Sequence, residues 1–328
     1  MHSAPGGLFI PRRVSRPGKP IVTRDDIRAA HGRIRTHVRR TPVIALEPGA
    51  FGLDARLVLK LESLQHTGSF KPRGAFNRIL SNPVPPTGVI AASGGNHGIA
   101  VAYAAKALGH RAEVFVPEIA SAAKVQRIRE HGASVVVTPG TYAESLEASG
   151  QRAGETGALV VHAYDQPEVL AGQGTVAMEL EEQAPDLDTL LVAVGGGGLL
   201  GGIASWYERR VRIVGVETEG CPALYSALKA GRPVDVDVGG IAADSLGARR
   251  IGSLAWELLR AHAITSQLVS DEDVVAAQRA LWREVRVVAE PGGAVALAAI
   301  LSGAYRPHAD ETVGVLVCGG NADPLSVM

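Results

Sequence analysis

The run Ser69-Phe70-Lys71-Pro72-Arg73-Gly74 follows a short apolar segment at 57–61 and places a lysine between an aromatic residue and a proline. A lysine held just after a buried strand can lose solvation. Its pKa then falls, until the neutral amine can attack a carbonyl carbon. Because most lysines are solvated surface residues, this run decides the interpretation only together with the rest of the chain.

Composition excludes several classes of protein. The chain has 328 residues, 46% of them hydrophobic, which is enough for two domains or one large α/β unit. The formal net charge is zero, which argues against a protein that binds nucleic acid through its charge. The two cysteines, Cys221 and Cys318, lie far apart and form no disulfide framework, as is typical of the reducing cytoplasm.

Two stretches bear on targeting and membranes. Residues 1–20 hold four basic residues and four prolines without an apolar segment. We therefore expect no signal peptide, but a flexible arm or one that packs on a neighbouring subunit. The uncharged stretch 189–207 contains six glycines. These glycines favour a buried strand, a turn and a helix over a membrane span. We therefore expect a soluble, cytoplasmic protein.

Short apolar runs alternate with helical patterns along most of the chain. The runs are mainly apolar rather than alternating, as expected of strands buried on both faces. Strands are predicted at 57–61, 89–92, 113–116, 134–137, 159–162, 190–194, 212–216 and 313–317. The alternation predicts an α/β protein with two open, twisted, mostly parallel sheets flanked by helices. Ligands bind such sheets beyond the carboxyl ends of the strands.

Local signals indicate domain and helix boundaries. A proline-rich linker at 83–86 and a helix restart near Glu168 indicate a smaller unit at 82–163. That unit is inserted into a larger one made of 1–81 and 164–328. Thr23 and Asp26 predict a capping box before a helix with Ile27, Ala30, Ile34 and Val38 on one face. Gly109 and Gly132 are expected to end two further helices.

Glycine-rich loops follow three of the predicted strands. Ser93-Gly94-Gly95-Asn96-His97-Gly98 opens backbone N–H groups at a helix start, which suits a carboxylate; a plain capping turn is the alternative. Gly195-Gly196-Gly197-Gly198 allows the backbone to wrap a phosphate. Cys318-Gly319-Gly320-Asn321 ends the last strand, and Cys318 alone would be interpreted as a small buried hydrophobic residue.

Other patterns leave alternatives open. Glu290-Pro291-Gly292-Gly293 opens a helix, and Glu290 could be a favourable charge at its start. His97 could equally be structural. Gly196, Gly198 and Gly201 fit G-x-G-x-x-G, and Glu217 stands where a ribose-binding acid would. A nicotinamide-binding oxidoreductase is therefore a rival interpretation. No residue cluster has zinc spacing, and no serine nucleophile elbow is present.

Taken together, these motifs resemble the serine/threonine dehydratase and serine racemase family. That family comprises pyridoxal-phosphate (PLP) enzymes of fold type II, similar to the tryptophan synthase β chain. The matching runs are Leu61 to Lys71, Ser93 to Gly98, Gly195 to Gly198, Glu290 to Gly293 and Cys318 to Asn321, in the family's order. The resemblance covers about residue 21 to the end. Each motif alone is modest, but the lysine run followed by four further motifs in order is highly specific.

The resemblance implies a role for each matching residue. PLP would lie in the cleft between the large and the small domain, with Lys71 holding it as a Schiff base. Phe70 would lie against its ring, Asn96 near the ring hydroxyl, Cys318 near the pyridine nitrogen and Glu290 near the ring. The phosphate would be bound by Gly195, Gly196, Gly197, Gly198 and Leu199. The substrate would be bound by Ser93, Gly94, Asn96, His97 and Gly247.

The activity implied is β-elimination from a 3-hydroxy amino acid. Lys71 would take the α-proton as general base, and loss of the hydroxyl would give a 2-oxo acid and ammonia. The thiol of Cys318 cannot keep a ring nitrogen protonated as a carboxylate would, which favours prompt loss of the β-group and disfavours transamination.

Two positions depart from relatives and sharpen the expected activity. Racemases of the family carry a serine where this chain has Gly94, so little racemisation is expected. Metal-dependent relatives carry an aspartate where Ala223 stands, so no metal is predicted beside Glu217.

The substrate side chain stays open. Serine and threonine are expected; phenylserine, hydroxyaspartate, a hydroxyectoine-derived amino acid, or serine as the substrate of a racemase are alternatives. A non-catalytic binding module on the same fold is a further alternative, but it gives Lys71 no role. The chain lacks the regulatory extension of biosynthetic threonine dehydratases, so we expect a catabolic type without isoleucine control. A homodimer is expected, since relatives are often dimers.

Overall fold

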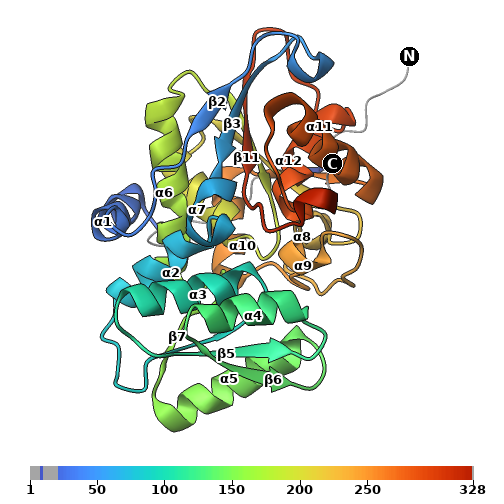
Figure 1. The fold of residues 1–328 in the computed structure, drawn as a ribbon. Helices are drawn as coiled ribbons and strands as arrows, with labels where there is room; N and C mark the ends of the chain where they lie inside the picture. The colour runs from blue at the N-terminus through green and yellow to red at the C-terminus, as the bar shows by residue number, and fades with distance from the viewer. Residues whose placement is uncertain (1–7, 10–20, 327–328) are drawn as a thin grey trace.

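The computed structural model describes residues 8–9 and 21–326 and contains two sheets (Figure 1). The larger sheet has seven strands in the order β1-β10-β9-β8-β11-β3-β2. Their bounds are β1 Leu8–Phe9, β2 Val43–Ala45, β3 Arg56–Leu61, β8 Thr189–Ala193, β9 Arg212–Thr218, β10 Thr265–Val269 and β11 Thr312–Val317. The five inner strands are parallel, and the edge strands β1 and β2 pair antiparallel.

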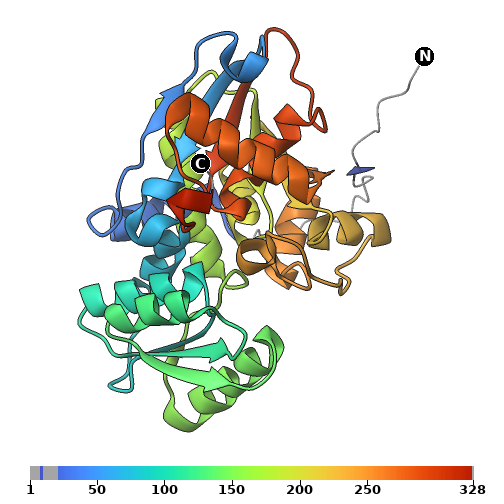
Figure 2. The same ribbon diagram turned by 45° about the vertical axis from the view of Figure 1, so that its right-hand side comes forward.

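The smaller sheet has four parallel strands in the order β6-β5-β4-β7. They are β4 Val89–Ala92, β5 Ala112–Pro117, β6 Ser134–Thr138 and β7 Leu159–Val160. These strands and their helices lie together at one end of the molecule in both views (Figures 1 and 2). We propose 82–163 as the bounds of this small unit and call the remainder the large unit.

Twelve α-helices cover the sheets in the described part of the chain. They are α1 Arg24–Ile34, α2 Lys71–Leu80, α3 Asn96–Ala107, α4 Ala122–Glu130, α5 Tyr142–Thr156, α6 Pro167–Gln183, α7 Gly198–Tyr207, α8 Ala223–Ala230, α9 Ala243–Leu246, α10 Ser253–His262, α11 Asp271–Val285 and α12 Pro291–Leu301. Figure 1 shows α3 and α4 on the side of the small sheet that faces the large unit, and α5 on its other side. None of the described helices is long and apolar enough to cross a membrane.

Local signals explain where the elements begin and end. Every residue of β8 is buried, as its apolar composition predicts. Thr23 caps α1 through the expected capping box, although α1 ends at Ile34, so that Val38 lies beyond the helix. Gly109 and Gly132 take positive φ values of 74° and 82° just after α3 and α4, which confirms both helix ends.

The expected α/β architecture with two mostly parallel sheets is confirmed. Strands β2 and β10 were not predicted, because β2 has three residues and Thr265-Ser266-Gln267-Leu268-Val269 is half polar. Of residues 1–20, only Leu8 and Phe9 are described, and they pair with β10. The expectation of a flexible arm there lies otherwise outside the described residues.

Candidate active site

The lysine segment and the cysteine segment lie side by side at the carboxyl ends of β3 and β11. The backbone N–H of Phe70 donates to the carbonyl of Cys318 at 3.2 Å, and that of Gly320 donates to the carbonyl of Gly68 at 2.8 Å. β3 and β11 are parallel neighbours, so both chains leave the sheet at the same edge. Lys71 then opens α2, with Pro72 in the helix's first turn.

Lys71 is a half-buried amine with one hydrogen-bond acceptor. Its Nζ donates to the carbonyl of Ala163 at 2.9 Å and lies 5.1 Å from the centre of the Phe70 ring. Burial lowers the pKa of Lys71 to about 8, opposed by the charges of Cys318 and Glu290. About a tenth of the amine is therefore neutral at pH 7, far more than for an ordinary lysine, and the neutral amine is the form that a nucleophile or a general base requires.

The glycine loop between β8 and α7 presents backbone donors. Within the described residues, the N–H groups of Gly195, Gly196, Gly197, Gly198 and Leu199 have no hydrogen-bond acceptor. Gly197 has a φ of 87°, which favours glycine. A Cβ at Gly196 would lie 2.4 Å from the ring of Tyr164. Five free N–H groups at a helix start form an anion site suited to a phosphate.

Asn96 and Glu290 are brought together from opposite sides of the site. Asn96 Nδ2 donates to Glu290 Oε1 at 2.5 Å. Burial raises the pKa of Glu290 to about 7, opposed by the Asn96 hydrogen bond and the charge of Lys124. Glu290 also precedes α12 without capping it through its side chain. Its carboxyl group is therefore directed to Asn96 rather than to the N–H groups of the helix start.

The loop before α3 is polar but carries no positive charge. Ser93 Oγ accepts from the N–H of Gly95 at 3.1 Å. His97 Nε2 lies 2.9 Å from the carbonyl of Val161, and burial and the charge of Lys71 lower the pKa of His97 to about 3. A neutral His97 donates a hydrogen bond to that carbonyl, so its ring is oriented by the backbone just after β7.

Gly94 is closely covered. A Cβ at this position would lie 2.6 Å from the Cβ of Ala120, closer than side-chain carbons pack. Any side chain at residue 94 therefore requires Ala120 to move. The chain here has neither a proton-transferring group at residue 94 nor room for one.

Cys318 lies at the end of β11 as a buried thiol. Its Sγ donates to the carbonyl of Gly292 at 3.3 Å, and burial raises its pKa. The thiol therefore stays neutral. A Cβ at the next residue, Gly319, would lie 1.9 Å from Glu290 Oε1, so any side chain there would displace the Glu290 carboxyl group.

Gly247 lies beside the glycine loop. It ends α9, and the preceding residue, Leu246, packs 3.3 Å from where a Cβ on Gly195 would be. From the same helix, Ser245 Oγ accepts from the N–H of Gly292 at 3.1 Å. The predicted segments after β3, β4, β8 and β11 thus meet in one region. Sequence reasoning missed Tyr164 and Ser245, although Tyr164 follows a strand end and could have been considered on that ground.

Glu217 has a structural role. It is fully buried, and its carboxylate accepts from the N–H groups of Leu224 and Tyr225 and from Ser266 Oγ, at 2.6, 2.8 and 2.8 Å. It therefore caps α8, which has no other side-chain cap. These bonds leave little of the carboxylate for a ribose or a metal ion. In the part of the chain that is described, no three metal-ligating side chains cluster.

A separate cluster of fully buried charged side chains anchors α2. Arg73 donates to both oxygens of Glu62 at 2.8 Å and to Glu179 at 2.8 and 2.9 Å. Lys60 Nζ donates to Glu179 at 3.0 Å, to Gln183 at 2.8 Å and to the carbonyl of Thr41 at 2.8 Å. Two positive and two negative charges balance, which a buried cluster requires. The cluster ties α2 to β3 and α6.

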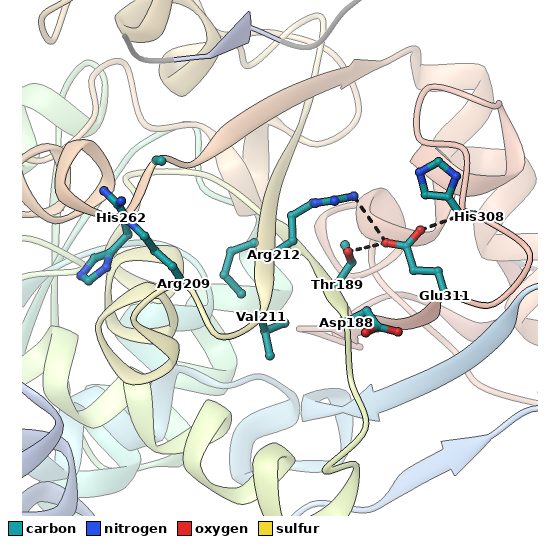
Figure 3. Close-up of a pocket in the computed structure, with 10 residues that line it drawn as sticks. Asp188, Thr189, Arg209, Val211, Arg212, His262, His308 and Glu311 are labelled. Carbon is teal, nitrogen blue, oxygen red and sulfur yellow. Dashed lines mark hydrogen bonds and ion pairs between the residues drawn. The ribbon is translucent and has the colours of Figure 1, made fainter. Parts of the chain in front are cut away.

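A pocket of about 590 Å³ lies elsewhere, at the amino ends of β8 and β9. Figure 3 shows Arg212 directed toward Glu311, with Arg209 and His262 on the other side. Glu311 already accepts from Thr189 Oγ1 at 2.5 Å. The glycine loops and Lys71, whose pKa is lowered, follow the carboxyl ends of the strands at the opposite edge of the sheet. We therefore place the active site at that edge.

The residues at this edge fit PLP. Five unbonded N–H groups suit its phosphate, and the lysine amine suits its aldehyde. Cys318 offers a neutral thiol, and Asn96 keeps a second N–H hydrogen beyond the one given to Glu290. Lys71, the glycine loop, Asn96 and Cys318 are therefore the residues that would hold the cofactor.

Comparisons with known proteins identify the family. The family model for pyridoxal-phosphate dependent enzymes matches residues 34–319. An L-threonine ammonia-lyase of Geobacter sulfurreducens is 39% identical over 92% of this chain and 76% of its own. A beta-hydroxyaspartate dehydratase of Paracoccus denitrificans is 35% identical over 92% and 97%. The structure of maize serine racemase superposes with a TM-score of 0.88 at 32% identity, covering 94% of this chain and 96% of that one.

These findings confirm the expected fold type, cofactor and enzyme class, and they remove the nicotinamide interpretation. The roles assigned to individual site residues stay predictions that the geometry accommodates. The chain belongs to the pyridoxal-phosphate dependent enzymes and is a PLP-dependent ammonia-lyase, similar to threonine ammonia-lyases, other dehydratases and serine racemases.

Proposed function

We propose that this enzyme removes the β-hydroxyl and the amino group from a 3-hydroxy amino acid such as L-threonine or L-serine, giving a 2-oxo acid and ammonia. The observation that carries the proposal is the asymmetry at the α-carbon position. Lys71 offers an amine with a pKa of about 8. Gly94, which the resemblance to the racemases places on the other side of the α-carbon, carries no side chain and is covered by Ala120.

The chain's own residues divide the work. The N–H groups before α3 and Ser93 bind the substrate carboxylate. Lys71 removes the α-proton, since it is a basic group that burial keeps partly neutral. When bound, PLP supplies an electron sink for the charge that develops on the α-carbon. Cys318 remains an uncharged thiol, so it gives no charge stabilisation to a long-lived carbanion.

The test is a panel of 3-hydroxy amino acids with chiral analysis. We expect ammonia and 2-oxo acid to form in equal amounts from L-threonine or L-serine, and D-serine to form more slowly than either product. Rapid interconversion of L- and D-serine would contradict the proposal. Turnover of hydroxyaspartate or phenylserine alone would support the proposed elimination reaction but identify a substrate other than threonine or serine.

The covered glycine gives a sharper version of this test. Gly94→Ser combined with Ala120→Gly makes room for a hydroxyl opposite Lys71, whereas Gly94→Ser alone does not. We expect racemisation of serine to rise only in the double variant. Equal racemisation in both variants and in the parent protein would show that residue 94 has no part in the choice of reaction.

We also propose that the enzyme is a cytoplasmic homodimer. The two free, buried cysteines support the first point, and the resemblance to often dimeric relatives supports the second. Light scattering on the purified protein tests the oligomeric state, and a monomer mass would overturn it.

A further inference from the structure

Four side chains form a hydrogen-bonded row across the boundary between the two units. Arg127 Nη1 donates to Asn321 Oδ1 at 2.8 Å. Asn321 Nδ2 donates to Asn96 Oδ1 at 2.7 Å, and Asn96 Nδ2 to Glu290 Oε1 at 2.5 Å. Arg127 and Asn96 come from α4 and α3 of the small unit, while Asn321 and Glu290 come from the large unit. The row therefore crosses the boundary three times.

The direction of this row is fixed by chemistry. A guanidinium can only donate, so Asn321 must turn its oxygen toward Arg127. The carbonyl of Thr67 can only accept, and it lies 2.8 Å from Asn321 Nδ2. Both neighbours thus impose the same amide orientation on Asn321. Asn96 is then left with its oxygen toward Asn321 and its NH₂ group toward Glu290.

Arg127 differs from the cation beside it on the same helix. Lys124 forms an ion pair with Asp244 of α9. Arg127 is half-buried, and among the described residues it has no carboxylate partner, only the amide of Asn321. The guanidinium of Arg127 is thus half-buried and held only by a neutral amide. This arrangement suggests that its charge and its donor geometry act on the residues beyond Asn321, namely Asn96 and Glu290.

We propose that Arg127 is a positioning residue that acts through Asn321 to hold the Asn96 amide with its NH₂ group toward the cofactor. One N–H of Asn96 is then bonded to Glu290, and the other is left for the ring hydroxyl of PLP. This inference rests on the proposed role of Asn96, but on no particular substrate.

Arg127 also acts electrostatically on Glu290. Its positive charge lowers the pKa of Glu290, against the rise to about 7 that burial causes. The other charged or titratable groups that face Glu290 are Lys124 on α4, Asp244 on α9, Lys71 on α2 and Cys318 after β11. Removal of the charge at residue 127 should raise the pKa of Glu290 further.

The test compares four variants by measurements on the resting holoenzyme. Arg127→Met removes donor and charge, and Arg127→Lys keeps both. Asn321→Asp still accepts from Arg127 but can no longer donate to Asn96, so it keeps the contact between the units and interrupts the row. Arg129→Met is the matched control, since Arg129 is an exposed arginine on the same helix. PLP affinity and the pH dependence of the bound cofactor's absorbance are measured for each.

For Arg127→Met we expect about tenfold weaker PLP binding, the effect of one charge-assisted hydrogen bond. The pH midpoint of the absorbance change should move upward. Asn321→Asp should show a similar loss of affinity, and the double variant Arg127→Met/Asn321→Asp little more than either single one, because both interrupt the same row. Arg127→Lys should lie near the parent, and Arg129→Met should match it.

The proposal is overturned if Asn321→Asp binds PLP as tightly as the parent, since a simple clamp between the units would survive that change. It is also overturned if Arg127→Lys binds PLP as weakly as Arg127→Met and shows the same shifted pH midpoint. If Arg127→Met fails to fold, Asn321→Asp carries the decision. None of these readouts needs turnover, so they stand even if the proposed elimination reaction fails.

Discussion

Two lysines eleven positions apart, Lys60 and Lys71, show how one residue type serves structure or chemistry. Lys60 is fully buried in β3, and its Nζ has three acceptors, one of them the carboxylate of Glu179. Lys71 is half-buried at the start of α2 and has one acceptor, a backbone carbonyl. Burial lowers the pKa of both.

The two lysines differ in which groups oppose the lowering of their pKa by burial. At Lys60 the charge of Glu179 and then that of Glu62 act against it, and the ammonium is held in a balanced cluster. At Lys71 no carboxylate is bonded to the amine, so the neutral form is accessible. Burial alone therefore does not identify a reactive lysine; a buried lysine without an anionic hydrogen-bond partner at a strand end does.

The largest effect is expected at Lys71. Lys71→Ala should lower turnover by on the order of 10³-fold or more, because the base at the α-carbon is lost, while the fold is kept. Steady-state ammonia release measures this, with Lys106→Ala on the surface as control. Turnover within tenfold of the parent would mean that another group acts as the base.

Lys60 should behave in the opposite way. Lys60→Met leaves Glu62 and Glu179 facing Arg73 alone, so one buried negative charge is uncompensated. We expect the free energy of unfolding to fall by about 3 to 5 kcal/mol, with PLP still bound in the folded fraction. Urea unfolding measures this against Lys106→Met. A loss below about 1 kcal/mol would show that the cluster is not a stabilising unit.

A smaller effect sharpens the comparison through pH. Attack on the cofactor aldehyde requires the neutral amine, which is present above its pKa. The rate of PLP incorporation into apoenzyme should therefore rise as pH increases through about 8, rather than near 10.5 as for an ordinary lysine. Stopped-flow absorbance measures the rate, with Nα-acetyl-lysine as reference. A midpoint equal to that of the reference would remove the argument from burial.

Much of the fold was predictable because most inner strands are mainly apolar runs, β10 being the exception, and because parallel strands direct their following loops to one edge. Lys71, the glycine loop and Cys318 were found in this way. Lys60 was missed because 57–61 was treated simply as an apolar strand. The lysine inside it was a signal, but its partners Glu179 and Gln183 stand more than 100 residues away.

Arg127 was missed for a related reason. On a helix such as α4, an arginine among Lys124, Arg129 and Glu130 resembles an ordinary solvated charge. Arg127 contacts Asn321 only because the small unit packs against the large unit in the folded protein. Sequence patterns locate groups that follow strands, whereas positions that depend on how helix faces meet require the structure.

The most direct test of the central claim is to locate the lysine that binds the cofactor. Holoenzyme is treated with borohydride, digested and analysed by peptide mass spectrometry. We predict the reduced PLP adduct on the peptide that contains Lys71 and an unmodified Lys60. An adduct at Lys60 or at any other lysine, with Lys71 unmodified, would contradict the account.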